Sequence, residues 1–148
     1  MSFEDELLKF QIKTGNKIIG VSQNIAIDAM DELIEGTPVD TGLARRNWRA
    51  GLNKPAKGVL KGKDKTGEKA ARAGIKVIAR AKIGQDIWIT NNLFYVGILE
   101  RGSIYQAPLG FVNRVINRFD GMVMRAVVKT QSSHRNILGR VPVPRWWV

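Results

Sequence analysis

From Ile87 to Phe119 the chain reads IWITNNLFYVGILERGSIYQAPLGFVNRVINRF. Its first four residues, Ile87–Thr90, have the β-branched and aromatic side chains that are typical of a buried strand. Asn91 and Asn92 follow, and asparagine tolerates left-handed backbone and forms Asx turns. The stretch therefore predicts a strand that ends at a turn.

A short helix is predicted directly after this turn. Phe94, Ile98 and Leu99 have the spacing of one helical face, and Tyr95 lies between them in the sequence. Gly102 stands where a helix is usually closed by a left-handed residue. We therefore expect one short helix with a shared apolar face.

An extended connector and a second helix complete the stretch. Gln106, Pro108 and Gly110 belong to the connector, which is extended because the residue before a proline is pushed out of the helical region. Beyond it, apolar residues recur at three- and four-residue steps: Phe111, Val115, Ile116, Phe119, Met122, Val123, Ala126 and Val127. This pattern predicts one amphipathic helix.

The N-terminal segment Phe3–Ile34 is predicted to form a long amphipathic helix. Its apolar positions are separated by multiples of about 3.6 residues and are Leu8, Ile12, Ile19, Ala26, Met30 and Leu33. Ser2 is the expected N-cap, Gly36 ends the helix, and Gly15 or Gly20 marks a break. Such a helix either packs on a sheet or presents a surface to neighbouring subunits, and both alternatives stay open.

A turn element is predicted at Thr37–Gly42. Pro38 fixes its backbone angle, and Gly42 permits an otherwise strained conformation. The Asp40 carboxylate can accept hydrogen bonds from the following amides, and so holds the turn or caps a short helix from Leu43. We prefer this structural role to a catalytic one, because no second carboxylate or histidine lies nearby in the sequence.

The whole net charge of +11 lies in the segment Gly42–Lys82, which has 13 Lys and Arg and two acidic residues. Within it, Arg46–Leu52 alternates like a strand, and Glu68–Ala81 has a helical pattern. Residues Asn53–Gly67 alternate lysine with glycine, cannot bury enough apolar surface, and are predicted to be a flexible basic hairpin loop. Its lysines are Lys54, Lys57, Lys61, Lys63 and Lys65.

Two interpretations of this basic block stay open, namely a polyanionic neighbour and a solvated mobile loop. In the helix that follows, the basic side is Arg72, Lys76 and Arg80, and the apolar side is Ala71, Ile75, Ile78 and Ala79. The loop contains no phosphate-binding motif, because the terminal Gly-Lys-Ser or Gly-Lys-Thr and a preceding strand are missing.

The composition indicates one domain over residues 1–148, and the lack of cysteine suits a reducing compartment. The acidic start does not resemble a signal peptide, and no apolar run reaches the roughly 18 residues of a membrane span, so we expect a soluble intracellular product. From about residue 130 an extended arm is expected, since Val141–Pro144 carries alternate prolines. Its Trp146 and Trp147 are expected to dock on the chain's own body or on an adjacent subunit.

No catalytic, metal or cofactor site is predicted. His134 lies in a polar segment without a ligand partner at suitable spacing. Asp86 and Glu100 could form a metal-binding pair, but we expect Asp86 to belong to a turn and Glu100 to pair with a base such as Arg101. The sequence therefore argues against an enzyme.

Two blocks of residues resemble the motifs of a tailed-bacteriophage family of neck and tail-completion proteins. The first is Thr-Pro-Val-Asp-Thr-Gly-Leu-Ala-Arg at Thr37–Arg45, which includes Pro38, Asp40, Thr41 and Gly42. The second combines Asn-Asn-Leu-x-Tyr, Leu-Glu-x-Gly-Ser and Gln-Ala-Pro-x-Gly-x-Val, with the residues Asn91, Asn92, Tyr95, Glu100, Gly102, Gln106, Pro108 and Gly110. The blocks span more than half of the chain.

This resemblance implies an α+β subunit, in which a long N-terminal helix and further helices pack on a small antiparallel sheet. It further implies a structural virion protein, made in the host bacterial cytoplasm, that forms a six-fold ring in the neck. The ring would join the head-completion layer to the tail-terminator and tail-tube proteins and let DNA pass. We expect Lys54, Lys57, Lys61, Lys63 and Lys65 to meet an acidic partner layer.

Two other classes of function remain. A stand-alone nucleic-acid-binding module could combine the basic block with base stacking on Trp48. A small basic nuclease or toxin would require metal-dependent cleavage.

Overall fold

The structure, a computed structural model, describes residues 2–102 and 110–138. Its elements are α1 (Phe3–Gly36), α2 (Leu43–Arg46), β1 (Trp48–Leu52), α3 (Glu68–Ile78), β2 (Ile87–Asn91), α4 (Val96–Arg101), α5 (Phe111–Asn117) and α6 (Phe119–Leu138). A long N-terminal helix, a two-stranded antiparallel sheet and further helices make this an α+β fold, which confirms the predicted class.

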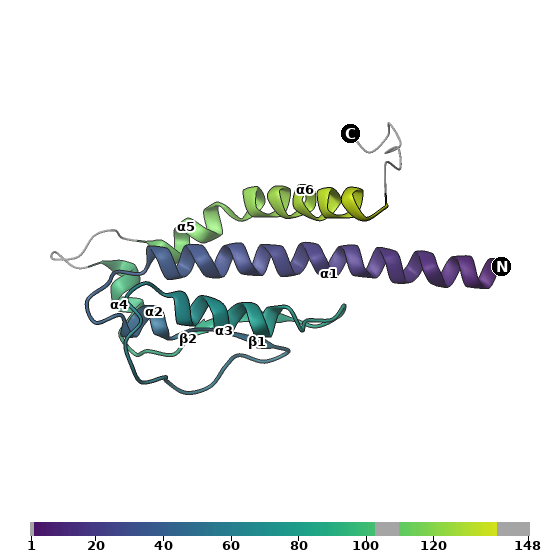
Figure 1. The fold of residues 1–148 in the computed structure, drawn as a ribbon. Coiled ribbons are helices and arrows are strands. Elements are labelled where there is room, and N and C mark those ends of the chain that lie inside the picture. The colour runs from purple at the N-terminus through teal and green to yellow at the C-terminus, as the bar shows by residue number, and fades with distance from the viewer. Residues whose placement is uncertain (1, 103–109, 139–148) are drawn as a thin grey trace.

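Helix α1 lies between two layers, with α5 and α6 on one side and α3 and the sheet on the other (Figure 1). It begins with a capping box, because the Ser2 hydroxyl accepts from the amide of Asp5 and the Asp5 carboxylate accepts from the amide of Ser2. The helix continues through Gly15 and Gly20, so the predicted break is wrong. At Gly20, α6 lies next to α1 through Thr130, at a distance where a Cβ would make ordinary van der Waals contact.

The sheet joins β1 and β2 in antiparallel register, with Trp48 opposite Asn91 and Leu52 opposite Ile87. The predicted strand therefore ends at the predicted turn. The basic segment 53–67 leads from β1 into α3 and not directly into β2, so it is not the tip of a hairpin whose arms are these strands. Its predicted flexibility stays a prediction.

The core lies between the C-terminal half of α1 and both layers. Met30, Ile78, Phe111 and Met122 are its most deeply buried large side chains. Trp48 from the inner face of the sheet meets Phe111 edge-on, with ring centroids 6.3 Å apart. These five side chains come from five elements and form one hydrophobic core, which joins α1 to the layers on both of its sides.

The ion pairs between α1 and α6 lie beside this core. Arg125 of α6 lies 3.7 Å from Asp28 and 3.6 Å from Glu32, and Arg118 lies 3.6 Å from Glu32. Because the side chains are partly exposed, each pair contributes on the order of 0–1 kcal/mol. They fix the register of the two helices more than they stabilise the fold.

Two helical faces differ from the predictions. Phe94, which precedes α4, and Ile98 within α4 are exposed, whereas Val96 and the predicted Leu99 pack on the core. In α3 the buried residues are Ala70, Gly74 and Ile78, whereas Ile75 and Ala79 are exposed. The reason is close packing, because a Cβ at Gly74 would overlap the Met30 side chain.

The second predicted helix is divided at Arg118, whose amide is shared between the carbonyls of Arg114 and Val115. Ile116 and Phe119 are exposed at this junction. Helix α6 then continues to Leu138, so the first part of the expected arm, including His134, is helical and not extended. Residues 139–148, with Trp146 and Trp147, lie outside the described residues.

Candidate interaction site

The two motif blocks, which lie about fifty residues apart in sequence, meet at one surface depression of about 240 Å³. The first block lines it with Pro38, Asp40, Thr41 and Gly42, and the second block lines it with Tyr95 and Leu99. The depression is open to solvent and has both polar and apolar lining residues. Such a shallow surface can seat a side chain of a partner, and it lacks the enclosure typical of a small-molecule site.

Asparagine side chains fix the second block to the first. Asn91 donates through Nδ2 to the carbonyl of Ala44, at 2.9 Å, and accepts from the amide of Leu93, at 3.2 Å. Asn92 donates to the carbonyls of Ala56 and Gly58 in the basic segment. The predicted Asx turn is therefore present and also makes long-range contacts.

Gly42 and Thr41 shape the first block. Gly42 has a φ of 85°, and a Cβ there would lie 2.5 Å from the amide nitrogen of Lys65. The amide of Leu43 donates to the Thr41 hydroxyl, at 3.3 Å, and α2 has no side-chain cap at Gly42. Thr41 therefore takes the local role that was predicted for Asp40, whose side chain is exposed.

Arg45, which the sequence did not single out, holds three carbonyl groups from two segments. Its guanidinium donates to Thr37 at 3.1 Å, to Lys65 at 2.9 Å and to Glu35 at 3.0 Å. Such a planar fork suits several acceptors at once. The only advance signal was its place in the motif Thr37–Arg45.

Trp48, Thr37 and Leu33 are joined by a chain of two buried hydrogen bonds. The indole Nε1 of Trp48 donates to the Thr37 hydroxyl at 2.8 Å, and that hydroxyl donates to the carbonyl of Leu33 at 2.6 Å. Both side chains are buried. Trp48 is therefore unable to stack on nucleic-acid bases, and that part of the nucleic-acid hypothesis is wrong.

Glu100 does not pair with Arg101 or another base within the described residues. Its carboxylate accepts hydrogen bonds from the amides of Val112, at 2.8 Å, and Asn113, at 3.1 Å. Its carbonyl accepts from the amide of Gly110, at 2.8 Å. Glu100 therefore joins the end of α4 to the first turn of α5, where Gly110 has a φ of 75° and Gly102 ends α4 with a φ of 76°.

The basic segment lies against the body through specific contacts. Asn47 exchanges two hydrogen bonds with the backbone of Leu60, and Arg49 donates to the carbonyl of Lys57. The buried Asp64 accepts from the amide of Ala70 at the start of α3. Asp64 thus directs the segment into the helix, which sequence patterns did not predict.

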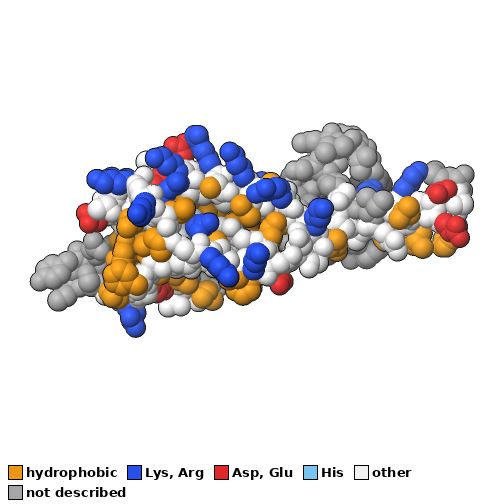
Figure 2. All heavy atoms as spheres, turned by 90° about the horizontal axis from the view of Figure 1, so that it is seen from below, with side chains coloured by type: hydrophobic (Ala, Val, Ile, Leu, Met, Phe, Trp, Pro, Cys, Tyr) orange, Lys and Arg blue, Asp and Glu red, His pale blue; other side chains and the backbone are white. Residues whose placement is uncertain are grey.

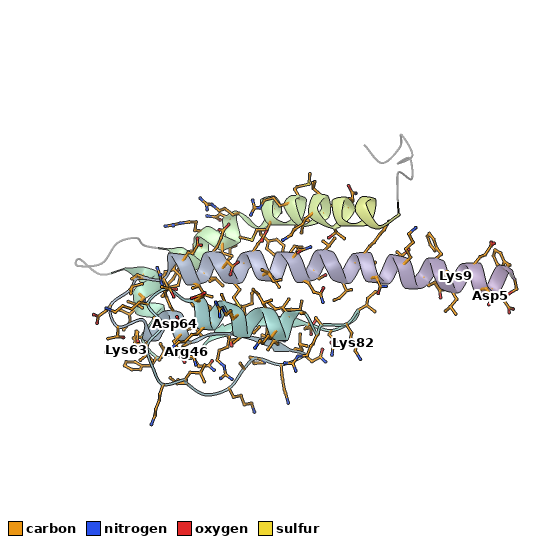
Figure 3. The ribbon with its side chains drawn as sticks, viewed as in Figure 1. Asp5, Lys9, Arg46, Lys63, Asp64 and Lys82 are labelled. Atoms are coloured by element: carbon orange, nitrogen blue, oxygen red, sulfur yellow. The ribbon has the colours of Figure 1, made fainter. Side chains whose placement is uncertain are left out.

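The predicted interface lysines are exposed. These are Lys54, Lys57, Lys61, Lys63 and Lys65. Figure 2 shows Lys and Arg side chains over the face of the molecule opposite α6, with hydrophobic side chains between them. Lys63 and Arg46 lie at the end of the body far from Asp5, as Figure 3 shows. The basic residues that cluster in the sequence thus also gather on one face of the molecule.

Asp86, one of the two carboxylates considered for a metal site, takes part in a structural contact through its backbone. The backbone of Asp86 exchanges hydrogen bonds with Asn53 at the end of the sheet, at 2.8 and 3.2 Å. In residues 2–102 and 110–138, no group of three or more His, Cys, Asp or Glu side chains is placed to hold a metal ion.

Two residues of the second motif block, Gln106 and Pro108, lie outside the described residues. In the part that the structure describes, no helix has the length and apolarity to cross a membrane.

Comparisons of the chain with protein-family models, with curated proteins and with solved structures found no match. The resemblance to neck and tail-completion proteins therefore stays a prediction that rests on the motif residues.

Proposed function

We propose that this protein is a structural subunit of a tailed-bacteriophage virion that assembles with copies of itself into a ring in the neck, between the head-completion layer and the tail tube. The observation that carries this proposal is that both motif blocks line one surface depression, to which Thr41 and Tyr95 contribute.

The way in which the motif side chains are used also supports a structural role. Asn91, Asn92 and Glu100 fasten irregular backbone through carbonyl and amide groups. Outside these contacts the molecule presents exposed apolar side chains, among which Phe94 is 91% exposed and Ile98 of α4 is 53% exposed. Exposed apolar surface of this kind marks sites of protein–protein contact.

The basic face supports contact with an acidic layer. Lys61, Lys63 and Lys65 are exposed, and no ion pair within the described residues neutralises them. A complementary acidic surface would both attract and orient this face. In a ring with a central DNA passage, we expect the lysines to face the adjacent protein layer and not the lumen.

Complementation in a phage that depends on this gene tests the proposal. We expect the triple variant Lys61→Glu, Lys63→Glu, Lys65→Glu to give filled heads and free tails that do not join. A control variant, Lys17→Glu with Arg114→Glu, reverses two exposed charges on α1 and α5, outside the basic segment 53–67. Normal yields of infectious particles from the triple variant would overturn the placement of the lysines at a layer interface.

One observation keeps a second candidate function, a basic nucleic-acid-binding module. Trp88 is 44% exposed on β2, opposite Gly51 of β1, and the lysine-rich segment begins two residues after Gly51. An exposed indole could stack on a base while lysines of the same molecule contact phosphates. Filter binding at two salt concentrations separates the candidates, since tight and steeply salt-dependent binding by the isolated protein favours the module.

A further inference from the structure

The N-terminal part of α1 extends beyond the rest of the molecule. At Gly15 the helix still lies next to Ile83, since a Cβ there would be 3.5 Å from the Ile83 side chain. Beyond this point residues 3–14 continue as a helical arm past the ends of α3 and α6 (Figure 1). At 1.5 Å per residue the arm is about 18 Å long.

This arm has an apolar stripe that no element among the described residues covers. Phe3, Leu7 and Phe10 share one face at i, i+4 and i+7, and Phe3 and Phe10 are 78% and 66% exposed. Glu4 and Glu6 border the stripe on its two sides, and no ion pair or side-chain hydrogen bond engages them within the described residues. The arm is therefore an apolar ridge with carboxylates in its first turn and with Lys9 and Lys13 further along.

A groove lies where β1 leads into the basic segment. It has a volume of about 360 Å³, and its lining includes Gly51, Leu52, Pro55 and Ala56 with Lys54 and Lys57. The backbone of the basic segment crosses directly over Gly51, where a Cβ would overlap the Lys54 carbonyl. The groove therefore presents two exposed lysines beside small apolar side chains.

We propose that the arm of one copy of this chain docks in the groove of a second copy. Phe3, Leu7 and Phe10 would contact the apolar lining residues Leu52, Pro55 and Ala56, and Glu4 and Glu6 would meet Lys54 and Lys57. The charges of the first turn of the arm and of the groove are opposite in sign. The carboxylates of this first turn disfavour nucleic acid and anionic membranes as its partner.

The contact is intermolecular because α1 is a continuous helix from Phe3 to Gly36, which holds the arm away from its own body. Two different surfaces are used, so the contact is heterologous, and heterologous contacts produce closed rings or open filaments. This contact would join neighbouring subunits of the proposed ring. Only its place in a virion rests on the proposed function.

Disulfide trapping tests the contact, and the absence of cysteine from the sequence makes the background clean. The variants Glu6→Cys and Lys57→Cys are purified separately, mixed and oxidised. We expect a cross-linked heterodimer, and a ladder of oligomers from the double variant. The control partner is Arg114→Cys, which also removes an exposed positive charge but lies in the opposite layer on α5.

We expect the cross-link with Lys57→Cys to exceed that with Arg114→Cys by about tenfold, as for a preference of about 1.4 kcal/mol. A second test exchanges charges: Glu4→Lys with Glu6→Lys, and Lys54→Glu with Lys57→Glu, should each abolish association, and a mixture of the two variants should restore it. Circular dichroism checks that each variant is folded.

Equal cross-linking to both partners, or no restoration in the mixture, would overturn the arm-and-groove contact. These results leave the proposed function open to its own test, because rings seen by electron microscopy without this cross-link would require another contact. Conversely, a specific cross-link in a protein that is absent from virions would support the contact and contradict the virion role.

Discussion

Glu100 accepts a hydrogen bond from the amide of Val112 at 2.8 Å, and thereby ties the end of α4 to the start of α5 across the segment 103–109. Replacement by alanine leaves the first-turn amides of α5 without this acceptor. We expect Glu100→Ala to lower the free energy of unfolding by about 1–2 kcal/mol, measured by urea denaturation.

The matched control is Glu68→Ala, which removes an exposed carboxylate paired only with Arg72 on the same helix. Its expected effect is within about 0.5 kcal/mol. If both variants lose the same stability, the capping role of Glu100 is wrong.

Trp48→Phe tests the buried hydrogen bond from the indole to the Thr37 hydroxyl. Phenylalanine retains most of the apolar contact with Phe111 but has no donor for the Thr37 hydroxyl, and it leaves a cavity. We expect a loss of about 2–3 kcal/mol in the free energy of unfolding. Trp88→Phe, at an exposed tryptophan, should change it by less than about 0.5 kcal/mol. A smaller loss at Trp48 than at Trp88 would contradict the assignment of Trp48 to the core.

Gly42→Ala tests the close approach between the first motif block and the basic segment. The new Cβ would be 2.5 Å from the Lys65 amide nitrogen and 2.6 Å from the Asp64 carbonyl carbon, in a backbone with positive φ. We expect a loss of about 2 kcal/mol or more. Gly58→Ala has a similar φ of 78° but open space around the Cβ, so about 1 kcal/mol is expected from backbone strain alone. Thermal unfolding of both variants measures the difference, and equal losses would show that the approach at Gly42 is unimportant.

Asp31 gives the protein a pH dependence of known sign. Partial burial, followed by the neighbouring carboxylates of Glu35 and Asp28, raises the pKa of Asp31 above 3.8, and Lys129 opposes this rise. The folded state therefore binds the proton more tightly than the unfolded state. The resulting penalty is fully present above the raised pKa and disappears as the pH falls through that pKa towards 3.8.

We expect Asp31→Asn to raise the melting temperature at pH 7, because asparagine has no charge to desolvate. The gain over the unmodified protein should shrink as the pH falls through the raised pKa. Thermal melts between pH 4 and 7 measure this, and a lower melting temperature for Asp31→Asn at pH 7 would contradict the account.

The accuracy of the sequence predictions follows the range of the interactions involved. The strand Ile87–Asn91, the Ser2 cap and the end of α1 near Gly36 depend on neighbouring residues, and these were predicted correctly. Periodicity also identified Ala26, Met30 and Leu33 as core positions.

Periodicity failed where the partner of a face decides its burial. Phe94 and Ile98 have helical spacing, but no described element covers them. In α3 the buried face passes through Gly74, since the approach of Met30 requires a small residue that hydrophobicity alone does not indicate. The contacts of Arg45 and Glu100 with distant backbone groups require the three-dimensional fold.

The most direct test of the central claim is cryo-electron microscopy of the neck in particles of a phage that encodes this chain, with mass spectrometry of the same particles. The account predicts the protein in every joined particle, as a ring of density between portal and tail tube that fits α1 between its two layers. Joined, infectious particles without this protein at the neck would contradict it.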